Sequence, residues 1–396
     1  MPPSFHRAPL SVALGALLGL AACGEAPAEP PPSDAGRASV DAASSGRDAA
    51  RVDAAQAPDA SDPEAPDAGR DDGDRGVFVA SGHLGRTVVS CDDGRTWVAD
   101  RSLDDAARCF EGGLDCDHHP GAARGIAFGA GWVFTTHGWG EGGAVRRSRD
   151  GARWEPVTDG TLFGGIAWGA GRLVGGARPP RLSDDAGEGW RDGGDTGLRL
   201  WNVRRTAYAD VAGGRFVLVA NDGGANDVVL SADGGERWWS PSRLPAGCGA
   251  GIQDRGGIAG ADGLLVILGG DGLACRSEDG GDTWTAHRVT DGAIDSHLVH
   301  TGGRFVAWSR GARHASEDGE TWIATPTDPP DLSIEAVAHD PATGTFVAVE
   351  RGWGEWYEEQ ALHRSADGVS WTPVASFVGG HPLRFVASGR LPSCPD

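Results

Sequence analysis

The stretch Ser277-Glu278-Asp279-Gly280-Gly281-Asp282-Thr283-Trp284 has the composition of a tight turn between two β-strands. The carboxylate of Asp279 can accept hydrogen bonds from backbone N–H groups of its own turn. Gly281 stands where the backbone needs a positive φ, which glycine adopts without steric penalty. Trp284 begins the next strand and offers a large apolar surface for burial. The stretch therefore predicts a strand–turn–strand unit.

The same pattern, Ser-x-Asp-x-Gly-x-x-Trp, recurs along the chain, in some copies one residue shorter. Internal repetition of this kind is typical of proteins built from one structural unit used many times. The seven copies are Ser90–Trp97, Ser148–Trp154, Ser183–Trp190, Ser231–Trp238, Ser277–Trp284, Ser316–Trp322 and Ser365–Trp371. Their aspartates are Asp92, Asp150, Asp185, Asp233, Asp279, Asp318 and Asp367.

The sequence between the copies alternates apolar and polar residues, as β-strands do. In one repeat, two such strands lie near Arg205–Ala209 and Gly214–Val219, and a third, Asp227–Ser231, runs into the turn. A fourth strand begins at the tryptophan of each copy. We find no convincing amphipathic helix, so the sequence predicts an all-β fold with four strands in each repeat.

The pattern resembles the Asp-box, or BNR repeat, of sialidases, of sortilin-type receptors and of photosystem II stability/assembly factors. The resemblance covers the chain from about Gly76 to the C-terminus. It implies that each copy marks the turn between the third and fourth strands of a β-propeller blade, on the face away from the ligand, and that its aspartate is structural. The architecture is most similar to the seven-bladed photosystem II assembly-factor type, and more distantly to sialidases, which have six blades.

The two ends of the repeat region complete each other. Two strands, near Gly76–Ser81 and Arg86–Ser90, precede the first turn, and one spare strand, Leu383–Ser388, follows the last. Pairing these terminal strands would close the ring and remove exposed sheet edges. The prediction is an all-β, seven-bladed β-propeller of four-stranded antiparallel blades, closed by its N- and C-terminal strands.

The first part of the chain has a different composition. Residues 1–22 read as a secretory signal, because Arg7 precedes an apolar run, Ala8–Leu20, that is too short to span a membrane permanently. The run ends Leu20-Ala21-Ala22-Cys23, which resembles a bacterial lipobox and implies a lipid on Cys23; the alternative is an ordinary cleaved signal followed by an incidental cysteine.

Residues 23–75 combine this cysteine with a segment rich in Ala, Pro and Asp, which we expect to be a disordered acidic tether. Residues 76–396 are the expected propeller domain. We therefore expect a monomeric lipoprotein of the bacterial cell envelope, anchored at the periplasmic face or at the cell surface.

Six further cysteines are expected to form three disulfides in an exported protein. The pairs that the strand arrangement favours are Cys91–Cys394, Cys109–Cys116 and Cys248–Cys275. The alternative is a metal site made of Cys109, Cys116, His118 and His119, but their spacing does not match a common zinc pattern. We therefore predict neither a metal nor a cofactor.

The net charge of −21 bears on the partner. Nucleic acids require a basic surface, so a nucleic-acid partner is excluded, and the membrane is expected to be contacted through the lipid anchor alone. A ligand is expected on the top face, which the loops between strands two and three and the connections between blades form.

The top-face loops contain aromatic, carboxylate, histidine and arginine side chains, which suit a protein or carbohydrate partner. The motif Gly-Trp-Gly-Glu occurs in two of these loops, and the alternative is that these tryptophans only pack against adjacent loops. The candidate binding residues are His118, His119, Trp139, Glu141, Trp201, Arg204, Trp353, Glu355, Trp356, Tyr357 and Glu358.

Catalysis has weaker support than binding. The sialidase resemblance implies an arginine cluster, a tyrosine nucleophile beside a glutamate and an Arg-Ile-Pro motif before the first repeat. That motif is missing, and Tyr357 with Glu358 is the only candidate nucleophile pair. Glu141 and Glu355 are an alternative carboxylate pair for a glycosidase. The sequence favours a non-catalytic scaffold with no catalytic residue, and leaves a sialidase-like or other glycoside hydrolase as the alternative.

Overall fold

The structure is a computed structural model, and it describes residues 74–101, 121–139, 142–159, 163–197, 203–222, 225–252, 255–351, 360–377 and 382–395. The expected signal, Cys23, the expected Cys109–Cys116 bond and all but the last two residues of the expected tether lie outside the described residues, and Arg75, the last of the tether, begins the first strand. The described strands all belong to one compact unit.

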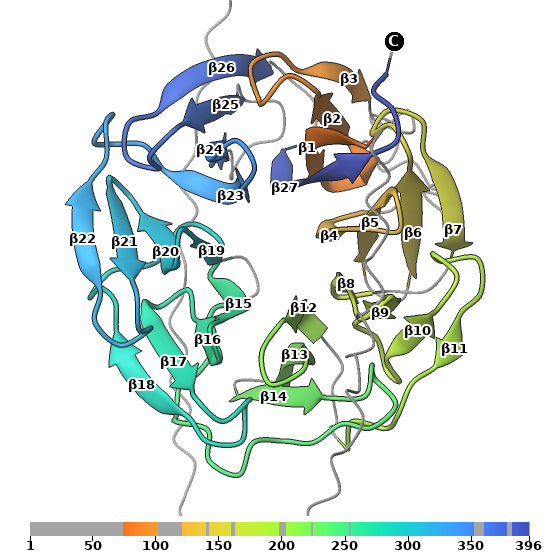
Figure 1. Ribbon diagram of the computed structural model, residues 1–396, viewed down its shortest axis with the longest axis vertical. Helices are drawn as coiled ribbons and strands as arrows, with labels where there is room; N and C mark the ends of the chain where they lie inside the picture. Colours follow the sequence, from red (N-terminus) through yellow and green to blue (C-terminus); the bar gives the residue numbers. More distant parts are fainter. Residues whose placement is uncertain are drawn as a thin grey trace, which may run out of the picture. The chain divides into compact units, whose positions relative to one another are not determined.

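The described residues form seven antiparallel sheets, which are arranged as the blades of a ring (Figure 1). Blade 1 consists of β27 (Leu383–Leu391), β1 (Arg75–Gly82), β2 (Thr87–Ser90) and β3 (Val98–Arg101), with a short 3₁₀ helix η1 (His83–Gly85) between β1 and β2. Blade 2 consists of β4 (Ala123–Gly129), β5 (Trp132–Trp139), β6 (Gly142–Ser148) and β7 (Glu155–Asp159). Blade 3 consists of β8 (Ile166–Gly169), β9 (Arg172–Gly175), β10 (Arg181–Ser183) and β11 (Arg191–Asp192).

The other four blades follow in chain order. Blade 4 consists of β12 (Val203–Ala209), β13 (Arg215–Asp222) and β14 (Ala225–Ser231). Blade 5 consists of β15 (Gly257–Ala261), β16 (Leu264–Leu268), β17 (Leu273–Ser277) and β18 (Thr285–Arg288). Blade 6 consists of β19 (Val299–Thr301), β20 (Arg304–Ser309), β21 (Ala312–Ser316) and β22 (Ile323–Pro326). Blade 7 consists of β23 (Ile334–Asp340), β24 (Thr345–Glu350), β25 (Gln360–Ser365) and β26 (Thr372–Phe377).

The ring is closed by the two ends of the repeat region. Strand β27 pairs antiparallel with β1 along its length, so that Ala387 lies opposite Val79. The innermost strands contact one another around the whole ring, in the order β27, β4, β8, β12, β15, β19, β23 and back to β27. The expected seven-bladed propeller and its mode of closure are therefore confirmed.

Blade 4 departs from the regular pattern, because its fourth strand is reduced to one bridge pair, Leu230 with Trp239. Pro241 follows two residues later and has no N–H to donate to a ladder. The chain instead crosses to blade 5, where the N–H of Ser242 donates to the carbonyl of Asp282 at 3.1 Å. Six of the seven described sheets therefore have four strands, as expected, and blade 4 has three.

The seven repeat copies form the turns between the third and fourth strands, and we call them the Ser-Asp turns. In each, the serine Oγ donates to Oδ1 of the aspartate at 2.8–3.0 Å. The same Oγ accepts the N–H of the turn glycine, which has a positive φ in all seven, including +107° at Gly281. The serine and aspartate side chains of the turns are therefore satisfied locally, as the pattern predicts.

Arginines link neighbouring blades through these turns. An arginine of one blade donates to a backbone carbonyl in the Ser-Asp turn of the next blade, which fixes the two sheets relative to each other. The five pairs are Arg147 with Ala186, Arg172 with Gly234, Arg276 with Asp318, Arg313 with Asp367 and Arg364 with Asp93.

Two disulfides lie within the described residues, and both match expected pairs. Cys91, in the first Ser-Asp turn, is bonded to Cys394, which follows the closing strand. Cys248, in the irregular segment after blade 4, is bonded to Cys275 of β17. Disulfides are typical of proteins in the extracellular space or the periplasm, so the structure indicates such a location.

Candidate functional site at the top of the central channel

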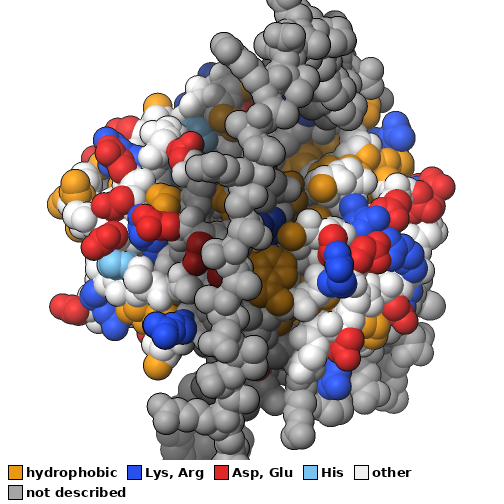
Figure 2. Space-filling model, turned by 60° about the horizontal axis from the view of Figure 1, so that its bottom comes forward, with side chains coloured by type: hydrophobic (Ala, Val, Ile, Leu, Met, Phe, Trp, Pro, Cys, Tyr) orange, Lys and Arg blue, Asp and Glu red, His pale blue; other side chains and the backbone are white. Residues whose placement is uncertain are grey.

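The innermost strands surround a cavity of about 210 Å³ on the axis of the ring. Each of the seven blades contributes to its wall. Figure 2 shows one face of the molecule, where charged side chains of both signs spread over the outer part and hydrophobic side chains are visible nearer the middle. The axis is the place in the described part of the fold where residues from all blades converge.

Arg205 of blade 4 reaches towards residues of two other blades. Its Nη2 donates to Nε2 of His297, at 2.8 Å, and its guanidinium lies 5.2 Å from the ring centroid of Phe385. Phe385 in turn lies 5.2 Å from the imidazole of His297. Because the arginine can only donate, Nε2 is the acceptor and the imidazole proton resides on Nδ1.

The chemistry of His297 follows from its surroundings. Burial is the main cause that holds the pKa of His297 well below its usual value, and the positive charges of Arg205 and Arg384 lower it further. The imidazole is therefore neutral at neutral pH. It serves as a hydrogen-bond acceptor that orients Arg205.

A set of ion pairs continues from this point into blades 6 and 7. Glu335 is 2% exposed and pairs with Arg384, at 2.8 Å, and with Arg351, at 3.8 Å. Arg351 also donates to Asp295 at 3.1 Å, and Arg255 approaches the same carboxylate to 3.9 Å. Because a buried charge that loses its partner is strongly destabilising, these side chains are held in fixed positions.

All of these residues lie at one end of the channel. Arg205, Glu335 and Arg384 are near the first residues of their inner strands, and Asp295 and His297 come just before β19. In an antiparallel blade the inner strand begins at the end opposite the Ser-Asp turn. The charged residues therefore lie on the top side, where a ligand is expected from the sequence.

The structure tests few of the candidate binding residues. Arg204 is at the start of β12, beside Arg205. Trp139 is the last residue of β5, and only its backbone is described. The others, which are His118, His119, Glu141, Trp201, Trp353, Glu355, Trp356, Tyr357 and Glu358, lie outside the described residues.

Sequence reasoning did not single out His297, Glu335 or Arg384. A signal was present, since Glu335 and Arg384 are charged residues at the start of otherwise apolar inner strands. Such a residue either faces the channel or lies between blades, and the sequence alone does not decide which.

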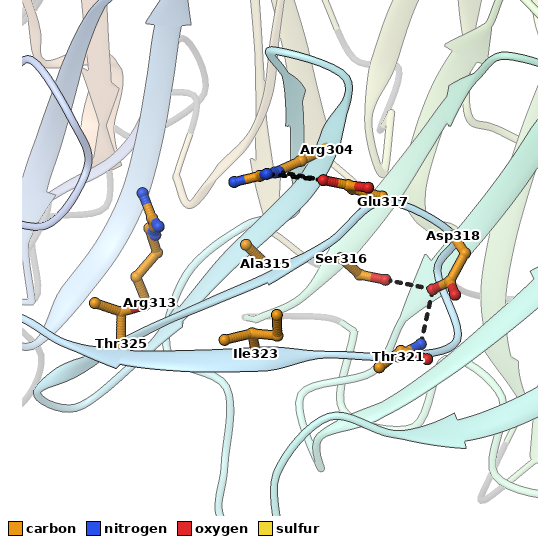
Figure 3. A pocket seen from close by; sticks show the side chains of 9 residues that line it. All are labelled: Arg304, Arg313, Ala315, Ser316, Glu317, Asp318, Thr321, Ile323 and Thr325. Carbon is orange, nitrogen blue, oxygen red and sulfur yellow. Dashed lines mark hydrogen bonds and ion pairs between the residues drawn. The ribbon is translucent and has the colours of Figure 1, made fainter.

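A second cavity, of about 370 Å³, lies along blade 6 (Figure 3). Arg304 there is paired with Glu317 at 2.7 Å. Asp318 accepts the hydroxyl of Ser316 and the N–H of Thr321, as the turn requires. The charged groups drawn in Figure 3 are thus largely engaged with one another, and we regard this cavity as the weaker candidate.

No three His, Cys, Asp or Glu side chains in the described part of the chain are arranged to hold a metal ion. Among the same residues there is no helix with the length and hydrophobicity needed to cross a membrane.

Comparison with known proteins identifies the fold and not a family. No family model matches the sequence, and no curated protein does. A protein from Lactobacillus plantarum has a similar structure, with a TM-score of 0.52, 10% identity, and coverage of 80% of this chain and 99% of that one. Apo AztD from Citrobacter koseri has a TM-score of 0.51 and 8% identity, with coverage of 80% and 98%.

YCF48 from Cyanidioschyzon merolae is also similar, with a TM-score of 0.47, 17% identity, and coverage of 66% of this chain and 93% of that one. At these identities the likeness concerns the fold alone. Function must therefore be argued from the residues of this chain.

Proposed function

We propose that the protein is a non-catalytic, exported binding protein that holds a protein or glycan partner on its top face. The Ser-Asp turns would be Asp-boxes of the BNR type, and the architecture would be that of the photosystem II assembly-factor propellers. Cys23 would carry the lipid, and residues 24–75 would connect the anchor to the propeller.

The observation that supports this proposal is the fixed charged network at the top of the channel. Asp295, Glu335 and Arg351 are joined by ion pairs that connect blades 6 and 7. In this proposal the network would serve as a rigid base for a partner that is bound at the top face. Rigid bases lower the entropy that is lost when a partner binds, which favours a binding role.

The chemistry of the network also favours binding over catalysis. A general acid or base works best when its pKa is near the operating pH. His297 is far from that condition, because burial and two arginines lower its pKa. Glu335 is held between two arginines and is almost inaccessible.

The experiment that tests the binding role uses the whole chain with Cys23→Ser, so that the lipid is absent and the propeller is intact. The protein is immobilised, incubated with envelope extract and, separately, applied to a glycan array. We expect a partner that is retained by this protein and lost with Trp353→Ala. Ile323→Ala is the matched control, because Ile323 is 67% exposed and follows a Ser-Asp turn, away from the top face.

The proposal is contradicted if both variants retain the partner equally. It is also contradicted if the protein hydrolyses chromogenic glycosides and Glu355→Gln abolishes turnover, since that result would establish a glycoside hydrolase. Lipidation is tested separately with a clickable fatty acid, which we expect to label the wild-type chain and not Cys23→Ser.

A further inference from the structure

One of the arginines that link neighbouring blades differs from the other four. Each of those four also pairs with a carboxylate, and the pairs are Arg147 with Glu155, Arg172 with Asp184, Arg276 with Glu278 and Arg364 with Asp93. Arg313 donates to the carbonyl of Asp367 at 2.6 Å, and no carboxylate of the described residues lies within ion-pair distance of its guanidinium. The charge of Arg313 therefore lacks the kind of partner that the other four have.

Most of the hydrogen-bonding capacity of Arg313 is also unused. A guanidinium has five N–H donors, and the bond from Nη1 to Asp367 uses one of them. The Nε is buried and has no acceptor in the described part of the chain, and Nη2 donates to none of the described residues. Because Arg313 lines the cavity along blade 6, a ligand there can accept hydrogen bonds from it.

A second arginine lines the same cavity. In Figure 3 the ends of the side chains of Arg304 and Arg313 both lie above Ile323. Burial is the main cause that lowers the pKa of Arg313, and the charge of Arg304 lowers it further, although Asp367 opposes the shift. An anion that binds between two like charges relieves their repulsion. Arg304 pairs with Glu317, but both side chains are largely exposed, and such pairs contribute little.

The cavity also has an apolar part. Ile323 of β22 is 67% exposed and lies opposite Ala315 of β21. Thr325 lies opposite Arg313 two residues further along each strand, so the apolar pair and the arginine share one face of blade 6. The volume of about 370 Å³ is within the roughly 300–1,000 Å³ of ligand pockets. A ligand that covers Ile323 removes apolar surface from water, which is favourable.

We propose that this cavity binds the C-terminal residue of a peptide when that residue is aliphatic. Its carboxylate lies between Arg304 and Arg313, and its side chain lies against Ile323. A C-terminal aliphatic residue carries both groups on one carbon, and the planar guanidinium matches the geometry of a carboxylate. The site is beside the Ser-Asp turn of blade 6, away from the top face, and does not depend on the partner proposed above.

The test is a titration of the whole chain, carrying Cys23→Ser, with N-acetyl-leucine, followed by ligand-observed NMR. N-acetyl-leucinamide is the matched probe without the charge, and N-acetylglycine is the matched probe without the side chain. We expect saturable binding of N-acetyl-leucine. The amide is expected to bind at least about tenfold more weakly, because hydrogen bonds to a charged group are lost. N-acetylglycine is expected to bind at least about threefold more weakly, because Ile323 stays uncovered.

Variants of the chain test the position of the ligand. Arg313→Gln is expected to weaken the binding of N-acetyl-leucine by about tenfold or more. Ile323→Ser is expected to weaken it by about threefold or more. Arg237→Gln is the control, because Arg237 is also a surface arginine paired with a carboxylate, in the Ser-Asp turn of blade 4, and its loss is expected to leave the affinity unchanged.

If Arg313→Gln does not fold, Arg304→Gln takes its place and a weakening is again required. The proposal is overturned if N-acetyl-leucine does not bind saturably, if the amide binds as tightly, or if Arg237→Gln weakens binding as much as the cavity variant. The probes are single residues, so none of these outcomes bears on the top-face partner, which is measured by the retention experiment.

Discussion

Arg364 of blade 7 forms a two-point contact with Asp93 of blade 1, although the two residues are 271 positions apart in the sequence. Its Nε donates to the backbone carbonyl of Asp93 at 2.7 Å, and its Nη2 pairs with the carboxylate. Asp93 has a φ of +64° and also accepts the hydroxyl of Thr343 at 2.7 Å. The contact therefore joins the last blade in the ring order to the blade that contains both ends of the repeat region.

Replacing Arg364 is expected to destabilise the ring. Arg364→Gln leaves the carboxylate of Asp93, which is 16% exposed, with a weaker set of partners. We expect a loss of about 2 kcal/mol in the free energy of unfolding, measured by urea denaturation. Arg237→Gln is the control, because the side chain of Arg237 is 89% exposed, and it is expected to change stability by less than about 1 kcal/mol.

A double-mutant cycle with Asp93→Asn isolates the pair, since asparagine tolerates the left-handed backbone at this position. If the loss of stability in the double variant equals the sum of the losses in the two single variants, the pair is not coupled.

The two described disulfides are expected to differ in their effect on stability. Cys91–Cys394 spans 303 residues and Cys248–Cys275 spans 27. In the chain-entropy model the longer loop restricts the unfolded chain more, by about 2 kcal/mol. The double variant Cys91→Ser/Cys394→Ser is therefore expected to unfold at a lower urea concentration than Cys248→Ser/Cys275→Ser. The reverse order would show that the local packing around Cys248 dominates.

Acid is expected to destabilise the propeller through the Ser-Asp turns. The pKa of Asp318 is lowered to about 2, chiefly by the hydrogen bond from the backbone N–H of Thr321. Burial raises this pKa, but the further hydrogen bonds to the carboxylate lower it again. In Asp279, burial raises the pKa, but hydrogen bonds from Thr283 and Ser277 outweigh it, and the value is again about 2.

The pKa of each of these carboxyl groups is lower in the folded chain than in the unfolded chain, where it is 3.8. Such a group contributes its full stabilisation at a pH above the pKa of the unfolded chain. The stabilisation is lost as the pH falls through the pKa of the folded chain. We expect the melting temperature, followed by circular dichroism, to fall between about pH 4 and pH 2. The decrease should be smaller in Asp318→Asn than in the wild type, and an unchanged slope would contradict this origin.

Trp308 is expected to stabilise the junction between blades 6 and 7. It is fully buried, and its indole N–H donates to the carbonyl of Gly368 in the Ser-Asp turn of blade 7, at 2.8 Å. Trp308→Phe removes this bond and leaves a cavity, so we expect a loss of about 2–4 kcal/mol in urea denaturation. Trp322→Phe is the control, because the indole of Trp322 bonds within its own turn, at Gly319, and is less buried. Equal losses in both would show that the link between blades adds nothing.

Much of the fold follows from local sequence patterns. The Ser-Asp turns, the positive φ of Gly281 and the pairing of Leu383–Ser388 with Gly76–Ser81 were all predictable, because each depends on a short motif or on strand counting. The pairing Cys91–Cys394 followed from the same counting. The shortened fourth strand of blade 4 was not predicted, because the effect of Pro241 depends on where blade 5 lies.

The candidate site was less predictable than the fold. The contacts of Arg205 with His297 and Phe385 join three blades, and no local pattern fixes which inner-strand residues meet across the axis. The arginines between blades gave a weak signal, since Arg147, Arg276 and Arg364 each stand directly before the serine of a repeat copy. The role of these arginines becomes recognisable only when the structure shows that each can form a hydrogen bond with the Ser-Asp turn of the next blade.

The pairing of β27 with β1 also bears on biosynthesis. The innermost strand of blade 1 is made after all the other described strands, so a nascent chain on the ribosome has no complete ring to form. Export in an extended state is therefore compatible with this topology, because the ring cannot close before β27 has been made. A fragment cut before Leu383 would expose the edge of β1, and an unpaired strand edge is a template for pairing with another chain and so for aggregation.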